Sequence, residues 1–481
     1  MKILLNEACN NMNESRRLLE INKTYEALER LKKILPKFEG TKEEWKIHEM
    51  IGAAFHDIGD AEGAVQAYFN AVKTDEYLRS QREHYSNYLF TLHYLDNIDN
   101  ITLANEHFIY NDLFRDTEQL KNISNSSLNI GYLADNFLES SSARFYEALL
   151  TNYNRDEFKV KCFSLSSETD KFTSKIKSNV DEFITLDNIS VEEAAQQIFD
   201  KNIDILFDLS GHSDGGLTLQ IMSYKPAPIQ ITGIGWFDTT GLKAIDYILT
   251  DNYLAPIGHE KYFSEKLLRL NSAFAFVPSE SMINNNLKLR ITNYELTFAC
   301  FNNFMKVTDE YLKCVKKILN KVTDSKFIMQ DTTNIIARKI EMEERIKKLR
   351  LPIDRVEICL GNDDYLKDYA DIDIILDTFP YNGGMMTATA LYMGVPVICL
   401  YGSRHSSRFG ADILRLANCS EWIASDNKNY IEIAISLAKN FEKLTEIKKS
   451  LRERIINSKL FDTKNFVNEL EYQYKRMVDF K

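Results

Sequence analysis

Proline and glycine are scarce in this chain of 481 residues, and scarcest near its beginning. No proline lies between Pro36 and Pro226, and only four glycines precede Gly131. Because both residues disrupt helix interiors, their absence favours a helical first quarter. Long apolar runs are also lacking: no stretch approaches the ~18 residues of a membrane span, and the first residues lack the apolar run and cleavage site of a signal peptide. We therefore expect a cytoplasmic protein.

Cysteine pairs and basic clusters are missing as well. The seven cysteines are scattered without a C-x-x-C pair, which argues against a zinc motif and fits reduced thiols in a cytoplasm. Lysine and arginine total 59 against 70 aspartate and glutamate residues, a net charge of −11. Such a chain repels phosphate backbones and anionic lipids unless it carries a local basic block, and we find none. We expect no nucleic-acid partner and no membrane partner.

Small and bulky residues alternate in segment 50–72, MIGAAFHDIGDAEGAVQAYFNAV, which predicts two short helices joined at Gly59-Asp60. Gly52 lets a second helix approach closely, and Tyr68 can fill the space. The spacing resembles one tetratricopeptide repeat, whose period is about 34 residues. An ordinary helical hairpin is the alternative. Either one buries a full core only when stacked, so this region should pack against the adjoining part of the chain.

From residue 127 onward, apolar runs of strand length alternate with amphipathic helical segments such as Tyr311–Val322. This alternation predicts parallel sheets covered on both faces, an α/β fold. A polar stretch near residues 278–295 separates two series of strands, so we expect two doubly wound domains, 121–285 and 286–481, after a helical region 1–120. The predicted strands are Leu128–Leu133, Phe158–Phe163, Asp204–Leu209, Ile229–Ile234, Tyr247–Thr250, Leu296–Phe301, Lys326–Met329, Val356–Leu360, Ile372–Leu376 and Val395–Tyr401.

The segment most informative about chemistry is 376–409, LDTFPYNGGMMTATALYMGVPVICLYGSRHSSRF. A strand ends there, Gly383-Gly384 turns the chain, and Met385–Met393 reads as a short helix. Without Cβ atoms at the two glycines, an anion can approach the backbone, and the free N–H groups of the helix N-terminus favour a diphosphate. A Gly-Gly pair by itself is equally typical of a plain tight turn.

This segment resembles the donor site of the O-linked N-acetylglucosamine transferase/SPINDLY family, with its L-D-T-x-P-Y-N-G-G-T-T-T signature followed by M-G-V-P-V. Segment 208–246, DLSGHSDGGLTLQIMSYKPAPIQITGIGWFDTTGLKAID, is similar to the family's D-L-x-G-H-T, R-P-A-P-x-Q and W-x-G-Y-P-x-T-T-G elements in the same order. Segment 298–306, FACFNNFMK, is similar to its F-x-x-F-N-x-x-x-K. Ordered matches of this kind identify the chain as a member of the family.

The resemblance implies a GT-B fold, with two Rossmann-like domains behind a tetratricopeptide-like region. It also implies transfer of a sugar, N-acetylglucosamine or another hexose, from a UDP- or GDP-linked donor to protein Ser or Thr hydroxyls. Inversion at the anomeric carbon, no metal and no cofactor besides the nucleotide-sugar co-substrate are expected. A protein acceptor and the nucleotide-sugar are then the partners, and a homo-oligomer stays open.

Residue roles follow from the resemblance. Lys306 matches the family's donor-phosphate lysine, whose ammonium would stabilise the leaving nucleoside diphosphate; a surface lysine at a strand end is the alternative. His212 is expected to orient the acceptor or assist proton removal, the alternative being a locally hydrogen-bonded loop histidine. The residues expected to bind the donor are Asn303, Tyr365, Asn382, Gly383, Gly384, Met385, Met386, Thr387, Thr389, His405 and Arg408.

Several of these positions depart from the family pattern. Met385 and Met386 replace two hydroxyl residues of the T-T-T run, and Thr389 stands where relatives hold the ribose with a carboxylate. Tyr365 replaces a ring-contacting histidine, and a further family histidine, whose place falls near Glu139-Ser140, is missing. An altered donor, reduced activity or a non-catalytic scaffold that binds protein through its helices are the alternatives these changes leave open. A nucleotide-sugar epimerase is a third class with the same architecture.

Overall fold

The computed structural model describes most of the chain, which divides into two compact units. The described residues are 2–75, 78–121, 128–285, 287–290 and 295–479. Unit 1 comprises residues 1–98, 285–402 and 420–452, and unit 2 comprises residues 99–284, 403–419 and 453–481. Each unit is therefore assembled from separate stretches of sequence.

Unit 1 begins with antiparallel helices and continues into a parallel sheet. The helices of the first stretch are α1 (Lys2–Glu20), α2 (Thr24–Ile34), α3 (Glu44–Ile58), α4 (Ala61–Thr74) and α5 (Leu78–Leu92). They pack in sequence order, each against its neighbour, and α1 to α4 contribute to one apolar cluster. This arrangement confirms the helical region expected from the lack of proline and glycine.

The α3–α4 hairpin is built as the sequence predicted. Gly59 ends α3 with a left-handed φ of 92°, and the carboxylate of Asp60 caps α4 by accepting a hydrogen bond from the Gly63 N–H at 2.9 Å. A Cβ atom on Gly52 would lie 2.7 Å from the Tyr68 ring, so only glycine allows the two helices to approach this closely.

The sheet of unit 1 has the strand order β10-β9-β8-β11-β12-β13, with all pairs parallel. Its strands are β8 (Leu296–Phe301), β9 (Ser325–Gln330), β10 (Val356–Cys359), β11 (Ile374–Leu376), β12 (Val397–Leu400) and β13 (Ile423–Ala424). The strand order reverses direction between β8 and β11. In open α/β sheets, ligands bind beyond the carboxyl ends of the strands at such a switch point.

Helices of unit 1 connect these strands. They are α12 (Asp309–Lys321), α13 (Ile336–Leu349), α14 (Met385–Tyr392) and α16 (Asn427–Ala438), while α17 (Phe441–Ile456) crosses the boundary into unit 2. In α12 the buried residues include Leu312, Val315 and Ile318, which recur on the face that the apolar spacing predicted.

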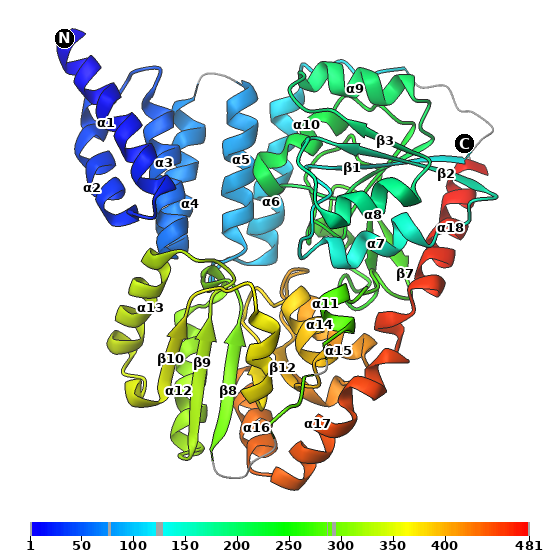
Figure 1. The fold of residues 1–481 in the computed structure, drawn as a ribbon. Helices are drawn as coiled ribbons and strands as arrows, with labels where there is room; N and C mark the ends of the chain where they lie inside the picture. Colours follow the sequence, from blue (N-terminus) through cyan, green and yellow to red (C-terminus); the bar gives the residue numbers. More distant parts are fainter. Residues whose placement is uncertain (1, 76–77, 122–127, 286, 291–294, 480–481) are drawn as a thin grey trace. The chain divides into compact units, whose positions relative to one another are not determined.

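Unit 2 holds a larger parallel sheet of order β3-β2-β1-β4-β5-β6-β7. Its strands are β1 (Leu128–Ala134), β2 (Phe158–Ser164), β3 (Glu182–Thr185), β4 (Ile205–Asp208), β5 (Ile229–Thr232), β6 (Tyr247–Asp251) and β7 (Lys266–Leu270). Its helices are α6 (Asn100–Tyr110), α7 (Ala143–Thr151), α8 (Lys171–Asn179), α9 (Val191–Asp200), α10 (Leu217–Met222), α11 (Glu280–Ile283), α15 (Phe409–Leu416) and α18 (Thr463–Asp479). Helices α7 and α8 lie on one side of the sheet and α9 and α10 on the other (Figure 1). The two sheets confirm the prediction of two doubly wound α/β folds.

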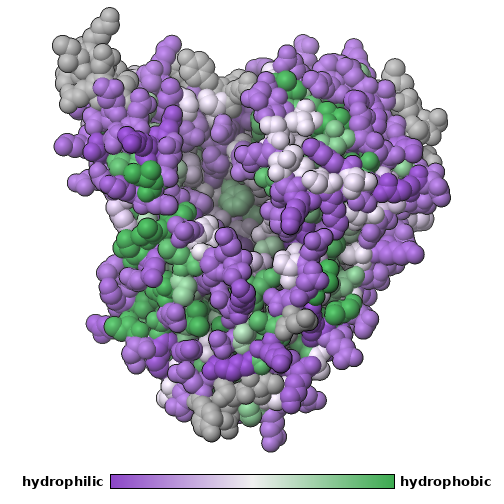
Figure 2. Space-filling view, in the orientation of Figure 1, coloured by the Kyte–Doolittle hydropathy of each residue, from purple (hydrophilic) through white to green (hydrophobic). Residues whose placement is uncertain are grey.

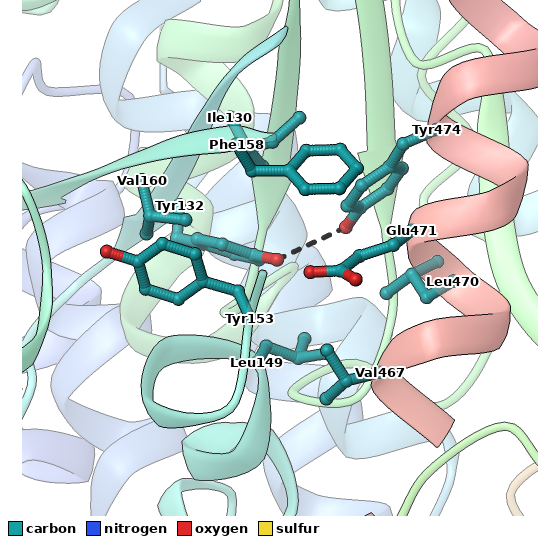
Figure 3. A pocket seen from close by; sticks show the side chains of 10 residues that line it. All are labelled: Ile130, Tyr132, Leu149, Tyr153, Phe158, Val160, Val467, Leu470, Glu471 and Tyr474. Carbon is teal, nitrogen blue, oxygen red and sulfur yellow. Dashed lines mark hydrogen bonds between the residues drawn. The ribbon is translucent and has the colours of Figure 1, made fainter. Parts of the chain in front are cut away.

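The end of the chain completes the core of unit 2. Along α18, Val467, Leu470 and Tyr474 face β1, β2 and α7 around a small apolar recess (Figure 3). The hydroxyls of Tyr132 and Tyr474 lie 3.3 Å apart at its centre. The last helix is therefore part of the hydrophobic core of unit 2.

The face shown in Figure 2 is largely hydrophilic, with hydrophobic residues in smaller groups. This agrees with the 27% of charged residues and the net charge of −11. Among the described residues, no helix combines the length and apolar character that crossing a bilayer requires.

Candidate functional site

Asp377, the residue after β11, organises the loop of residues 377–384 that leads into α14. Its side chain is fully buried, and Oδ1 accepts hydrogen bonds from the N–H groups of Gly383 at 2.8 Å and Thr378 at 2.9 Å. The amide of Asn302, just after β8, donates a third at 3.0 Å. Burial raises the pKa of this carboxyl, while Lys306 and the donated hydrogen bonds oppose the shift. The carboxyl ends of β8 and β11 are thereby tied together at the switch point.

Gly383 is buried and its packing requires a glycine, whereas Gly384 is partly exposed. A Cβ atom on Gly383 would lie 2.6 Å from Thr387 Oγ1 and 2.8 Å from Asp377 Oδ1, so no side chain fits there. Gly384 precedes the first residue of α14, and no side chain caps this helix end. Uncapped N–H groups and the positive end of the helix dipole attract anions.

Lys306 lies at this loop. It ends the short turn Phe304–Lys306 after β8, and its ammonium donates a hydrogen bond of 3.0 Å to the Asn382 carbonyl. The same nitrogen sits 3.9 Å from the centre of the Tyr381 ring, a cation–π contact. Burial lowers the pKa of Lys306 to about 8, against the opposing effect of Asp377. The lysine is therefore mostly protonated at neutral pH, and little water surrounds its charge.

Asn303 holds the turn that carries Lys306. Its side-chain oxygen accepts a hydrogen bond from the Met305 N–H at 2.9 Å and another from Arg338 Nη1 at 3.0 Å. Arg338 is almost fully buried and also lies 3.6 Å from Asp331. The structure thus gives the oxygen of Asn303 two donors within the protein.

Two buried polar atoms near the loop lack partners within the described part of the chain: Asn382 Oδ1 and Thr389 Oγ1. Buried polar atoms are usually hydrogen-bonded, and these two are among several such atoms in the described residues that have no partner within the protein. By contrast, the Thr387 hydroxyl approaches Asp377 Oδ2 at 3.4 Å. Met385 and Met386 are half-buried in the first turn of α14, and Tyr365 is half-buried at the start of the turn Tyr365–Asp371 before β11.

His212 belongs to unit 2, where it follows β4. It is 1% exposed, its Nε2–H donates to the Thr240 carbonyl at 2.9 Å, and its ring packs edge-on against Tyr110 and Trp236. Burial and the neighbouring His107 lower its pKa well below the ordinary value, so the imidazole is neutral. This is the locally hydrogen-bonded arrangement that the sequence left as one of two alternatives.

His405 and Arg408 also belong to unit 2. His405 Nδ1–H donates to the Phe237 carbonyl at 2.7 Å and Nε2 accepts from the Thr250 hydroxyl at 3.0 Å, while burial lowers its pKa to about 4. Arg408 Nη1 donates to the Leu254 carbonyl at 3.0 Å. Both side chains are buried among residues of this unit.

The sequence placed Lys306 and the Gly-Gly turn in one donor site, but it did not identify the residues that hold them there. Asp377, Tyr381, Asn302 and Arg338 received no role. For Asp377 a signal was present, because a carboxylate directly after a buried strand at a switch point is an unusual residue to bury. Contacts of Arg338 and Tyr381 join residues far apart in the chain, and no local pattern marks them.

Comparison with known proteins agrees with this geometry. Residues 97–295 and 275–470 match the description of glycosyl transferase family 41. "Probable UDP-N-acetylglucosamine--peptide N-acetylglucosaminyltransferase SPINDLY" of Petunia hybrida is 31% identical over 72% of this chain, and that of Hordeum vulgare is 32% identical over 74%. The chain spans only 38% of the length of each of these relatives.

A mutant O-GlcNAc transferase from Thermobaculum terrenum has the same fold, with a TM-score of 0.86. The match covers 95% of this chain and 88% of that one at 24% identity. It confirms the GT-B fold class. With a family match over most of its length and the signature loop in place, this chain belongs to glycosyltransferase family 41.

Proposed function

We propose that this protein transfers a sugar from a nucleotide-sugar to Ser or Thr hydroxyls of a protein acceptor. The observation that carries the proposal is the Lys306 ammonium, 3.0 Å from the Asn382 carbonyl in the loop that opens into the N-terminus of α14. A cation and an uncapped helix end at one loop suit a leaving diphosphate. The names of the SPINDLY relatives, which specify UDP-N-acetylglucosamine and a peptide, support this donor and acceptor.

In the proposed reaction the acceptor hydroxyl oxygen attacks the anomeric carbon from the face opposite the diphosphate. The bond from that carbon to the diphosphate oxygen breaks, its electron pair passes to the oxygen, and the hydroxyl proton is released. Negative charge grows on the leaving oxygen, where Lys306 and the N–H groups at the start of α14 would stabilise it. The sugar is transferred with inversion.

The loop and its surroundings would bind the rest of the donor. The N–H groups of Gly384 and the first turn of α14 would take the diphosphate, in place of the hydroxyls that Met385 and Met386 do not provide. Gly383, whose own N–H donates to Asp377, would shape the loop beside it. Asn382 Oδ1 and Thr389 Oγ1, buried and without partners among the described residues, are polar atoms that a ligand could satisfy. Tyr365 offers a ring for the base.

Unit 2 would serve the acceptor. We place the role of His212 in shaping its loop, because its Nε2–H is bonded to the Thr240 carbonyl and burial lowers the pKa of the imidazole well below its ordinary value, which makes it a weak base. For His405 and Arg408 we propose a supporting role, since both are buried and bonded to main-chain carbonyls of unit 2.

A cytoplasmic location would keep the described cysteines reduced, and none of those is in a disulfide.

The charge on the leaving group is assigned to Lys306 and the helix end, so transfer should need no divalent metal. Initial rates with and without EDTA should agree within about twofold, given the typical worth of a catalytic metal of several kcal/mol. A rate that collapsed in EDTA and recovered with Mg²⁺ or Mn²⁺ would refute this part of the proposal.

The experiment that tests the function pairs donor binding with transfer. Calorimetric titration with UDP, GDP and their N-acetylglucosamine, glucose and fucose conjugates identifies the nucleotide. Incubation of the bound donor with cell protein, followed by intact-mass and peptide analysis, should reveal a hexose-type mass increase on Ser or Thr. Binding to none of these ligands would favour the non-catalytic scaffold, and a donor converted to its epimer without transfer would favour an epimerase.

A further inference from the structure

The Tyr381 ring, on which the Lys306 ammonium rests, is itself packed against the helical hairpins. Tyr94, two residues after the end of α5, places its ring 5.4 Å from that of Tyr381 at an interplanar angle of 32°. The adjacent His93 ring lies edge-on to Tyr381 at 6.5 Å. Lys306, Tyr381 and Tyr94 thus form a row in which the middle ring contacts both the ammonium and a second aromatic ring.

All members of this row belong to unit 1 and are closely packed. Tyr94 is 5% exposed and Tyr381 is 9% exposed, although Tyr381 lies in the loop that borders the open turn. A ring that contacts a cation must keep its face toward it, and close packing against neighbouring side chains limits its freedom to rotate away. Tyr94 is such a neighbour.

A second contact joins the same hairpins to the Lys306 turn. Arg338 donates through Nη2 to the carbonyl of His56, near the end of α3, at 3.2 Å, and through Nη1 to Asn303 Oδ1 at 3.0 Å. Asn303 caps the turn that ends at Lys306. Two points of the helical region, His56 and Tyr94, are therefore connected to the lysine through short chains of contacts.

We propose that Tyr94 is a positioning residue that holds Tyr381 beneath Lys306, so that the helical hairpins help to fix the ammonium at the loop where the leaving diphosphate binds. The inference rests on the proposed function for its catalytic consequence. The geometry on which it stands is independent of that function.

The charge of Lys306 offers a way to detect a change in this row. The titratable and charged groups around Lys306 are Asp377 and Tyr381 on the 377–384 loop and Cys300 on β8, with His93 and Tyr94 in contact with Tyr381 and Arg338 beside Asn303. Burial is the main cause of the lowered Lys306 pKa, which is about 8, and Asp377 and Cys300 oppose it. Removing the Tyr94 ring admits water, and a better-solvated ammonium has a higher pKa.

The test compares pH profiles of kcat/KM for Tyr94→Ala, Tyr94→Phe and a matched control, Tyr88→Ala. Tyr88 is a buried tyrosine of α5 that stacks on Phe69 instead of Tyr381. Since protonated Lys306 is the active form, activity of the native protein should fall as pH rises through about 8. In Tyr94→Ala this alkaline limb should move up by about one pH unit or more, and kcat at pH 7 should fall about tenfold or more. Tyr94→Phe, which keeps the ring, should stay within about threefold of the native rate.

An activity-independent readout separates this inference from the proposed function. Brief acylation with acetic anhydride across pH, with the Lys306 peptide quantified by mass spectrometry, reports the pKa of the lysine directly. The midpoint should lie near 8 in the native protein, Tyr94→Phe and Tyr88→Ala, and higher in Tyr94→Ala. If Tyr94→Ala does not fold, Tyr94→Leu keeps apolar volume without the aromatic face and should shift in the same direction.

The outcomes are distinct. An unmoved midpoint in a folded Tyr94→Ala or Tyr94→Leu variant, or an equal shift in Tyr88→Ala, would overturn the positioning role whatever the activity. A shifted midpoint in a protein that transfers no sugar would support the positioning role and remove the proposed function. A shifted midpoint together with a shifted kcat/KM limb would support both.

Discussion

Lys306 is the side chain to which the proposed stabilisation of the leaving diphosphate is assigned. Replacing it by Ala removes the ammonium that faces the leaving group and should lower turnover about 10²–10³-fold, the usual cost of losing one such contact. The melting temperature should change little, because the hydrogen bonds from Gly383, Thr378 and Asn302 to Asp377 still hold the loop. Thermal melts and initial rates measure both effects, with Lys317→Ala, an exposed lysine of α12, as the matched control. Activity within about threefold of the native rate would contradict the electrostatic role of Lys306.

Replacing Gly383 tests whether the 377–384 loop binds the diphosphate. In Gly383→Ala the new methyl group would meet Thr387 Oγ1 at 2.6 Å and Asp377 Oδ1 at 2.8 Å, so the loop must move. We expect UDP affinity to fall about tenfold or more, equivalent to about 1.4 kcal/mol. Gly258→Ala is a suitable control: that glycine has a φ of 92° but nothing within 4 Å, so its replacement should strain the backbone and leave UDP affinity unchanged. Unaltered calorimetric affinity in Gly383→Ala would show that the loop does not bind the diphosphate.

The sequence predicted which residues lie together at the site, but it did not predict the contacts that hold them in place. Lys306 and Asn382 were placed together because each follows a strand of the same domain, and the carboxyl ends of parallel strands share one edge. Tyr381 and Arg338 contact residues of the helical region that are far away in the sequence. Contacts of this kind produce no local sequence pattern, so they could not be predicted. The buried environment of His212 was likewise invisible, because it depends on α6 and on the loop around Trp236.

Among the elements, the strands missed by the sequence share one property. β3 and β7 are the two edge strands of the unit 2 sheet, and β13 is an edge strand of the unit 1 sheet. Central strands of a parallel sheet are buried on both faces and read as continuous apolar runs, whereas edge strands carry charges. Lys266 and Arg269 in β7 and Glu182 in β3 interrupt the apolar pattern, so these segments did not stand out.

The α3–α4 hairpin offers a prediction at the same scale. Asp60→Ala removes the carboxylate that accepts from the Gly63 N–H at 2.9 Å, and should lower the free energy of unfolding by about 1 kcal/mol. Asp60→Asn, which also caps helices well, should lose much less. Urea titration monitored by far-ultraviolet circular dichroism gives both values. Equal losses in the two variants would mean that the charge of Asp60, and not its cap, matters.

Across the whole molecule, stability depends on the last helix. Tyr474 is 2% exposed and packs from α18 onto the core of unit 2, whereas Tyr472, two residues earlier, is 58% exposed. Tyr474→Ala should lower the free energy of unfolding by about 3–5 kcal/mol, as truncation of large aromatic core residues does. Tyr472→Ala should stay within about 0.5 kcal/mol of the native value. Comparable melting temperatures for the two variants would exclude α18 from the cooperative core.

The route of the chain between the two units has a practical consequence for anyone who wants to study them apart. Unit 2 consists of residues 99–284, 403–419 and 453–481. Unit 1 consists of residues 1–98, 285–402 and 420–452. If the chain is divided near residue 285, the N-terminal fragment lacks α15 and α18, which belong to unit 2. The C-terminal fragment then contains both helices without the rest of unit 2. Isolated halves would have to be produced by circular permutation or by grafting, and not by choosing a new start or stop codon.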